Sequence, residues 1–233
     1  MKYPSQLIPG ILVKRYKRFL ADIVLDSGEE ITAHCANPGS MMNVAIEGSK
    51  VWVSRSPNEA RKLPYSWELI DLEGTLLAIN TSNPNKIAYE EVEAANIPEL
   101  RGYNSVRREV RYGENSRIDL LLEEEGKPSC YVEVKNVHLS RESGLAEFPD
   151  SVTARGAKHM RELAKVAREG QRAVLLYVVQ RGDCTRFSPA ADIDPVYALA
   201  LGEAKDAGVD LLCYDCEINT QEVRLRRPLP IKF

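Results

Sequence analysis

The chain has 233 residues, of which 44% are hydrophobic and 28% charged, and its formal net charge at neutral pH is −3. This is the composition of an ordinary soluble globular protein, with length for one large domain or two small ones. No run approaches the roughly 20 apolar residues that a membrane-spanning helix needs, and the start Met1-Lys2-Tyr3-Pro4 lacks the apolar core of a signal peptide. We therefore expect a cytoplasmic protein with no membrane partner and no uniformly basic surface.

The first 80 residues read as short strands separated by turn-forming residues such as Ser27-Gly28 and Asn37-Pro38-Gly39. Short strands at this spacing, with no convincing helical pattern among them, are typical of a small β-barrel, and a five-stranded OB-type barrel fits the size. The expected strands are Ile8–Val13, Phe19–Leu25, Glu30–His34, Lys50–Arg55, Tyr65–Leu72 and Thr75–Ile79.

A basic segment joins the first two of these strands and runs Lys14-Arg15-Tyr16-Lys17-Arg18. Basic side chains offer contacts to phosphates, and an interleaved aromatic ring offers a stacking surface for bases. The segment is therefore a candidate nucleic-acid contact. A solvated surface turn explains the same residues equally well.

The next candidate is the turn Asn37-Pro38-Gly39-Ser40-Met41, whose composition is that of a turn. Its backbone N–H groups could also cup a phosphate, which makes Asn37 a candidate nucleic-acid contact. A plain turn is the simpler interpretation. Further on, we expect Tyr65 and Trp67 to belong to the core of the barrel.

Residues 81–85, Thr81-Ser82-Asn83-Pro84-Asn85, form the expected linker between the barrel and a second domain of residues 86–233. A helix over Lys86–Ala95 should follow, with Asn85 as its cap. Glu90 and Glu91 are adjacent in this helix, so only one of them can face a site beside the core. Glu91 is the one we expect in solvent.

The richest stretch is residues 117–136, which reads as a β-hairpin around the apolar-free turn 124–129. Glu133 and Lys135 point to one face of their strand, and Asp119 lies within the apolar partner strand. A carboxylate in such a strand is costly to bury without a partner. Asp119 and Glu133 could converge on Mg²⁺, or alternatively Mn²⁺, with Lys135 beside the reacting phosphate. The competing interpretation is a salt-bridged hairpin.

A helix should run from a cap at Asp150 or Ser151 to Glu169, where Gly170 ends it. Its core stripe is Met160, Leu163, Ala164 and Ala167. A second stripe, Arg155, His159 and Glu162, could hold the scissile phosphate or the DNA backbone, or could be a solvated face.

The rest of the chain alternates strand and helix, which predicts a mixed-sheet α/β domain over residues 86–233. The apolar run Ala173–Gln180 should be a central strand, covered on both faces. A helix over Asp194–Ala207 should present an inner face of Val196, Leu199, Ala200, Ala204 and Ala207.

Several separate runs resemble the sugar fermentation stimulation protein A (SfsA) family: Arg117-Ile118-Asp119, Tyr131-Val-Glu-Val-Lys-Asn136 and Phe148-Pro-Asp-Ser-Val-Thr-Ala-Arg-Gly-Ala-Lys-His159. The resemblance extends over nearly the whole chain. It implies an OB-type barrel followed by a PD-(D/E)xK nuclease-like domain, DNA binding, and a role in sugar (maltose) utilisation. Ile118 stands where the nuclease motif has proline, which leaves the carboxylate ligand in place.

The resemblance also extends the candidate site. It implies that Glu90 is the helix acid near the metal, so that the catalytic set becomes Asp119, Glu133, Lys135 and Glu90. It supports nucleic-acid contacts at the basic segment, at Asn37, and at Arg155, Lys158 and His159.

Two functions follow from these residues. The first is a Mg²⁺-dependent nuclease acting on DNA or RNA. The second is a non-catalytic DNA-binding regulator that keeps a nuclease fold. A saccharide-binding module on the barrel rests on fold analogy alone.

Overall fold

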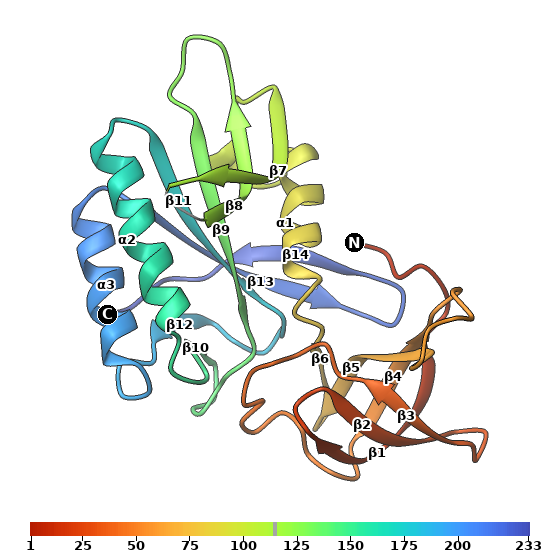
Figure 1. Ribbon diagram of the computed structural model, residues 1–233. Coiled ribbons are helices and arrows are strands. Elements are labelled where there is room, and N and C mark those ends of the chain that lie inside the picture. Colours follow the sequence, from red (N-terminus) through yellow and green to blue (C-terminus); the bar gives the residue numbers. More distant parts are fainter. Residues whose placement is uncertain (114–115) are drawn as a thin grey trace.

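The computed structural model describes residues 1–113 and 116–233, which form two six-stranded sheets, one two-stranded sheet made of β10 (Leu145–Phe148) and β12 (Arg186–Pro189), and three α-helices. Figure 1 shows the barrel-like part at the N-terminal end, and beside it a larger α/β part. The strands are β1 Ile8–Tyr16, β2 Leu20–Leu25, β3 Glu30–His34, β4 Lys50–Arg55, β5 Tyr65–Leu72, β6 Thr75–Ala78, β7 Ser105–Tyr112, β8 Ser116–Glu123, β9 Cys130–Val137, β10 Leu145–Phe148, β11 Arg172–Val179, β12 Arg186–Pro189, β13 Asp210–Ile218 and β14 Val223–Pro228. The helices are α1 Pro84–Glu93, α2 Ala154–Arg168 and α3 Pro195–Asp206, with a 3₁₀ turn at Pro98–Leu100.

The N-terminal sheet has the order β3-β2-β1-β4-β5-β6. A parallel bridge between His34 of β3 and Ser66 of β5 closes strands β1–β5 into the predicted OB-type barrel. Alternating burial along β2 and β3 turns every second side chain inward, as the period of a strand requires. Trp67 is completely buried in the barrel and Tyr65 is 9% exposed, so the prediction that both belong to its core is confirmed.

The second sheet is mixed and has the order β14-β13-β11-β9-β8-β7. Strands β9, β11 and β13 run parallel at its centre, and β7, β8 and β14 are antiparallel. Helices α2 and α3 cover one face and α1 the other (Figure 1). The side chains of β11 alternate between the two resulting cores, which explains its almost continuous apolar sequence.

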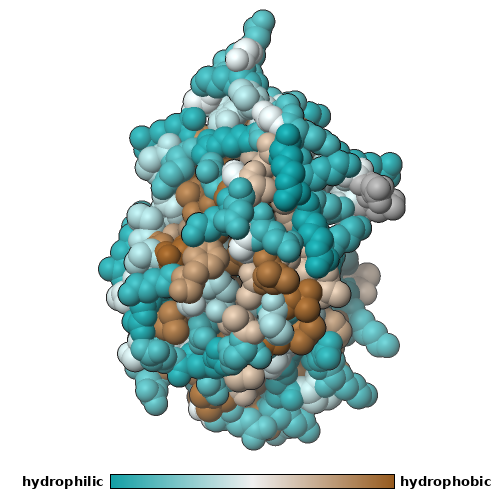
Figure 2. Space-filling view, turned by 90° about the vertical axis from the view of Figure 1, so that its left-hand side faces the viewer, coloured by the Kyte–Doolittle hydropathy of each residue, from teal (hydrophilic) through white to brown (hydrophobic). Residues whose placement is uncertain are grey.

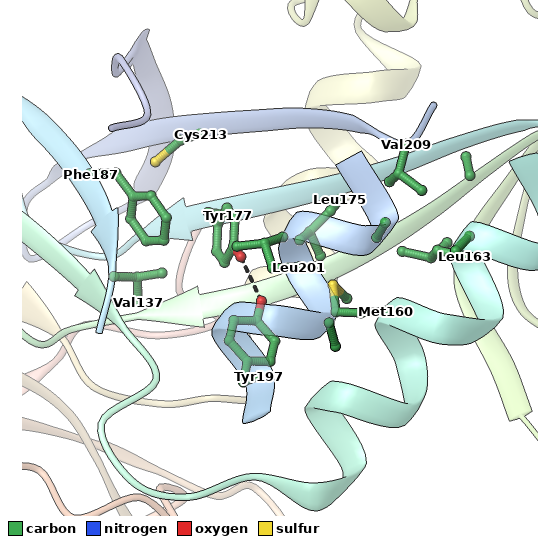
Figure 3. Close-up of a cluster of buried hydrophobic side chains, with 14 of the residues drawn as sticks. Val137, Met160, Leu163, Leu175, Tyr177, Phe187, Tyr197, Leu201, Val209 and Cys213 are labelled. Atoms are coloured by element: carbon green, nitrogen blue, oxygen red, sulfur yellow. Dashed lines mark hydrogen bonds between the residues drawn. The ribbon is translucent and has the colours of Figure 1, made fainter. Parts of the chain in front are cut away.

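Figure 3 shows the core under α2 and α3. Met160 and Leu163 of α2, Leu201 of α3 and Leu175 of β11 belong to this cluster, and each of these four side chains is completely buried. A hydrogen bond of 2.5 Å joins the hydroxyls of Tyr177 and Tyr197 within this apolar cluster. The pair satisfies two polar groups that burial would otherwise leave unpaired.

The helix boundaries correct three details of the prediction. Helix α1 begins at Pro84 after the N-cap residue Asn83, so Asn85 lies inside its first turn and the linker is shorter than expected. Proline suits a first turn because its missing N–H has no partner there. Thr153 caps α2 through a hydrogen bond from the Gly156 amide, in place of the predicted Asp150 or Ser151.

The predicted inner face of α3 is partly wrong. Val196 and Leu199 are 55% and 65% exposed, while Tyr197, Ala200, Leu201 and Ala204 are buried. The large Tyr197 ring occupies the core position because its hydroxyl finds a partner in Tyr177.

Figure 2 shows apolar surface near the middle of one otherwise mostly hydrophilic face of the molecule.

The two sheets meet at a polar contact centred on His138, which is 8% exposed. Its Nε2 lies 2.6 Å from the carbonyl oxygen of Ala78, so Nε2 carries the proton and donates it. Its Nδ1 then accepts from Asn136 Nδ2 at 2.9 Å. Asp150 also bridges the two parts, because its carboxylate accepts from the amide of Met41.

Among the helices of the described ranges, none combines the length and the hydropathy required of a membrane span.

Candidate active site

The two predicted metal ligands lie where strands β8 and β9 part. Their ladder pairs Leu120 with Val132 and goes no further toward Asp119. The Asp119 carboxylate accepts a hydrogen bond of 2.7 Å from the backbone amide of Val134. If the ladder continued, this amide would instead donate to a backbone carbonyl of β8. Beyond this point β8 pairs with β7 and β9 with β11. The side chain of Asp119 therefore helps to open the fork in which it sits.

Helix α1 holds Asp119 from the other side. The Asn85 side-chain amide donates to Asp119 Oδ1 at 2.6 Å. The sequence interpretation treated Asn85 as a helix cap and missed this contact. Its position on the first turn of a helix that precedes the acidic strands was the available signal.

Glu133 is the buried member of the pair, with a side chain that is 3% exposed. Its Oε1 accepts from Lys135 Nζ at 2.7 Å and makes a short contact with His159 Nδ1. Burial by itself would raise the pKa of Glu133. The hydrogen bond from His159 and the charge of Lys135 outweigh burial and lower that pKa. Glu133 is therefore ionised at neutral pH.

The other oxygen of this carboxylate, Glu133 Oε2, is buried and has no hydrogen-bond partner within residues 1–113 and 116–233. Buried carboxylate oxygens normally accept hydrogen bonds or bind a cation. Oε2 is thus the available ligand atom in the fork.

His159 is locked in one tautomer by Arg155. The guanidinium Nε of Arg155 donates to His159 Nε2 at 3.2 Å, and a guanidinium nitrogen cannot accept. Nε2 is therefore the acceptor, and Nδ1 carries the proton that points at Glu133. The 3.3 Å approach of Lys135 Nζ to His159 Nδ1 joins two donors and is not a hydrogen bond.

The electrostatics of the two carboxylates differ. Burial, and then the negative charge of Glu133, raise the pKa of Asp119 to about 6. The hydrogen bonds from Val134 and Asn85 and the charge of Lys135 offset only part of this effect. A second negative charge beside Glu133 is unfavourable unless a cation is present.

The donor set fits a small divalent cation. Both ligands are carboxylate oxygens, which Mg²⁺ prefers, and one of them is unpaired. No cluster of three or more His, Cys, Asp or Glu side chains suited to a metal occurs in the part of the chain that the structure describes. A cation here would therefore complete its shell with water or substrate, as Mg²⁺ commonly does.

The predicted helix acid, Glu90, is not drawn into this fork. Its carboxylate lies 3.0 Å from the amino group of Met1 and 3.8 Å from Lys86 Nζ. Glu90 is five positions after Asn85, which places the two side chains about 140° apart around the helix. The prediction that Glu91 is solvated is wrong, since Glu91 is 7% exposed and accepts from Asn96 Nδ2 at 2.7 Å.

Within the basic segment, three of the five side chains are engaged with the barrel itself. Lys14 Nζ and the Tyr16 hydroxyl lie 3.5 and 3.1 Å from the Asp22 carboxylate. Arg15 donates to the carbonyl oxygens of residues 37, 39 and 40 and so holds the Asn37–Met41 turn. Lys17 and Arg18 are exposed at the tip. These two remain candidates for phosphate contacts.

The other predicted nucleic-acid contacts lie in two places. Asn37 is 2% exposed, with its side chain between the Gly39 amide and the Ile79 carbonyl, so it stabilises the turn from within. His159 is 6% exposed and points inward to Glu133, whereas Arg155 is exposed and donates to the outer side of the His159 ring. Lys158 is half exposed and 3.7 Å from Glu162. The structure therefore brings His159 into the carboxylate cluster.

Fold and site together define a protein in which an OB-type barrel precedes a mixed-sheet α/β domain with a carboxylate–lysine–histidine cluster. The chain belongs to the sugar fermentation stimulation protein (SfsA) family. The SfsA N-terminal OB domain matches residues 13–79, and the sugar fermentation stimulation protein RE domain matches residues 82–222.

Close relatives cover the full length. The sugar fermentation stimulation protein homologue of Maricaulis maris is 55% identical over 100% of this chain and 99% of its own length. That of Rhodospirillum centenum is 56% identical over 98% of both chains. The structure of Pyrococcus furiosus SfsA in complex with Ca²⁺ matches with a TM-score of 0.89 and 28% identity, covering 100% of this chain and 98% of that one.

Proposed function

We propose that this protein is a Mg²⁺-dependent phosphodiesterase that acts on nucleic acid. The observation that carries the proposal is Glu133. One of its oxygens is held by Lys135 and His159, and the other is buried without a partner in the described ranges. Asp119 lies close enough for the charge of Glu133 to raise its pKa.

A relative supports the binding of a divalent cation by a protein of this fold. The Pyrococcus furiosus protein, similar over the whole chain, was solved in complex with Ca²⁺. Calcium and magnesium both prefer oxygen ligands. Asp119 and Glu133 are the residues that would hold the ion in this chain. When bound, it would supply a Lewis acid that polarises a phosphoryl oxygen.

The residues of the chain have distinct tasks in this proposal. Asn85 and the Val134 amide orient Asp119, and His159 orients Glu133. Lys135, with a side chain that is 13% exposed, keeps a positive charge beside the fork. A fixed ammonium group stabilises negative charge that develops on a phosphate in the transition state.

The alternative function is a non-catalytic DNA-binding regulator of sugar utilisation. The contact between Lys135 and Glu133 favours it, because a buried ion pair can also be a purely structural feature. In that case the carboxylates would stabilise the fold and bind no ion.

The test combines Mg²⁺ titration with cleavage of labelled DNA and RNA. We expect Asp119→Asn to weaken Mg²⁺ binding and Lys135→Ala to leave Mg²⁺ binding unchanged. Both substitutions should abolish cleavage. Asp206→Asn, an exposed residue at the end of α3, is the matched control. Nucleic-acid binding without cleavage or Mg²⁺ binding in the unaltered protein would establish the regulator instead.

A further inference from the structure

A cavity of about 410 Å³ lies beside the carboxylate fork, between strands β7 and β9 and helix α2. Tyr112 and Tyr131 line it from the sheet, and Arg161, Glu162 and Lys165 line it from the helix. A volume of this size suits a small organic ligand.

Two of the residues that line this cavity carry a buried polar atom without a hydrogen-bond partner in the described ranges. The Tyr112 hydroxyl and Glu162 Oε2 are buried and have no hydrogen-bond partner among the residues that the structure describes. An ionised carboxylate can only accept hydrogen bonds, whereas a phenol can donate or accept. A complementary ligand would therefore present an N–H or O–H donor to Glu162 and a second polar atom to Tyr112.

The rim of the cavity is positively charged. Lys158, Arg161, Lys165 and Arg111 surround it, against the two carboxylates of Glu162 and Glu169. Lys158 and Lys165 are 3.7 and 3.9 Å from glutamates of their own helix. Arg111 and Arg161 form no ion pair within residues 1–113 and 116–233. The rim therefore favours a ligand with an anionic group.

The inner wall of the cavity is aromatic. The rings of Tyr112 and Tyr131 lie 5.8 Å apart with planes inclined by 45°. Both residues are partly exposed, so either ring can offer an apolar face on which a planar group can stack. A planar ring with N–H donors and a phosphate is a nucleotide. A sugar phosphate lacks the planar ring, and a phosphotyrosine ring lacks the N–H donor.

The cavity adjoins the carboxylate fork along both of its walls, the sheet strand β9 and the helix α2. Tyr131 and Glu133 are two residues apart on one face of β9, a separation of about 6.6 Å. His159 and Glu162 are three residues apart on α2, a rise of about 4.5 Å. A nucleotide in the cavity would therefore neighbour a phosphodiester at Glu133.

We propose that this cavity binds one unpaired nucleotide of a single-stranded nucleic acid, with the base against Tyr112 and Tyr131 and the phosphate at Arg161 and Lys165. Glu162 accepts from the N–H groups on the edge of the base. That edge is engaged in a base pair within a duplex, so a duplex cannot enter without extruding the nucleotide. The inference deepens the proposed function and rests on it for the substrate class.

The experiment measures binding of a labelled single-stranded oligonucleotide and its duplex to the full-length protein in EDTA, by fluorescence anisotropy. We expect the single strand to bind at least about tenfold more tightly, the gain expected of a base stacked on aromatic rings. Arg161→Ala should weaken this binding severalfold. Arg168→Ala removes the same charge from the exposed end of the same helix, outside the cavity, and should have no comparable effect.

Two near-isosteric variants test the interior of the cavity. Tyr112→Phe and Glu162→Gln should each weaken single-strand binding about threefold, the effect of one hydrogen bond, and leave the melting temperature near that of the unaltered protein. Equal affinity for single strand and duplex, or equal effects of Arg161→Ala and Arg168→Ala, would overturn the proposal. Equally tight competition by inorganic phosphate would also overturn it.

Because EDTA removes the cation, these measurements do not depend on catalysis. Failure of the phosphodiesterase proposal would appear as absent Mg²⁺ binding with the single-strand preference intact. Failure of the cavity proposal would appear as lost strand preference with Mg²⁺ binding intact.

Discussion

At the scale of single residues, Asp119 and Glu133 show how neighbours separate two chemically similar carboxylates. Glu133 receives a proton donor from His159 and a positive charge from Lys135 through one oxygen. Asp119 receives only neutral donors, Asn85 and the Val134 amide. The pKa of Glu133 is consequently lowered, and that of Asp119 is raised to about 6.

The raised pKa of Asp119 predicts a pH-dependent stability. Its ordinary pKa is near 3.8, so the folded state holds the proton more tightly than the unfolded state, and stability decreases as pH rises from about 4 to 6. Above pH 6, Asp119→Asn should therefore raise the free energy of unfolding by up to about 3 kcal/mol in the absence of metal. Urea unfolding at pH 8 and pH 4 measures the difference.

This gain in the free energy of unfolding should disappear near pH 4. Saturating Mg²⁺ should stabilise the unaltered protein but not the Asp119→Asn variant. A marked loss of stability in Asp119→Asn at pH 8 would instead identify Asp119 as half of a structural ion pair. Asp206→Asn serves again as the control for removal of a carboxylate.

The Arg155–His159 contact leads to a second residue-scale prediction. Arg155 keeps His159 Nε2 unprotonated, so Nδ1 donates to Glu133. Removing a group that orients a metal ligand typically costs tenfold to hundredfold in metal affinity. We expect His159→Ala to weaken Mg²⁺ binding by about that factor, measured by calorimetry.

Nitrogen NMR of the unaltered protein tests the underlying geometry. The His159 ring should show its proton on Nδ1, and Arg155→Ala should allow the other tautomer to appear. A ring protonated on Nε2 in the unaltered protein would contradict the proposed orientation.

At the scale of elements, the turn between β1 and β2 divides its basic residues between two tasks. Lys17 and Arg18 have φ angles of 48° and 62°, which direct them to the exposed tip. Arg15 binds three carbonyl oxygens of the Asn37–Met41 turn. The basic sequence thus combines one structural arginine with two residues free for ligand contacts.

This division predicts that substitutions of Arg15 and of the two tip residues affect different properties of the protein. Arg15→Ala should lower the free energy of unfolding by about 1–3 kcal/mol, because its charged hydrogen bonds to the turn are lost. Lys17→Ala with Arg18→Ala should leave stability nearly unchanged. If both contact phosphates, the double substitution should reduce the slope of log affinity against log salt by about 1.4 for a single strand.

Nucleic-acid binding measured at several salt concentrations tests whether Lys17 and Arg18 contact phosphates. An unchanged slope would show that the tip is only a solvated turn. Arg15→Ala with full stability would show that its contacts to the Asn37–Met41 turn are dispensable.

At the scale of the whole molecule, His138 holds the barrel against the α/β sheet. Its Nε2–H donates to Ala78, and its Nδ1 accepts from Asn136, so Nδ1 cannot take a proton without losing its hydrogen bond. Burial is the main reason that the pKa of His138 is lowered to about 4.

Because the unfolded chain binds this proton near pH 6.5, the contribution of neutral His138 to stability is lost as pH falls from about 6.5 to 4. Asp119 acts in the opposite direction over much of this range. In the Asp119→Asn protein, we therefore expect stability to fall by up to about 3 kcal/mol between pH 7 and 4.

Adding His138→Gln should remove most of this pH dependence, at some cost in stability at pH 7. Melting temperatures across the pH range provide the comparison. An unaltered pH profile after His138→Gln would exclude His138 as its source.

The sequence by itself determined the architecture and the family. Alternating short strands predicted the barrel, and the apolar run Ala173–Gln180 predicted a central strand, because these patterns depend on local periodicity and on burial of whole faces. The same logic correctly separated the core stripe of α2, with Met160 and Leu163, from a second stripe that begins at Arg155.

Only the tertiary structure decided which polar residues meet. Glu90 joins the amino group of Met1, Asn85 reaches Asp119, and His159 turns from an expected DNA contact into a partner of Glu133. Each of these pairs joins residues from separate elements, and its geometry depends on where those elements cross. Hydrophobic periodicity specifies which face of a helix is buried, but it contains no information about which polar group lies opposite that face. That group is set by the packing of the whole chain.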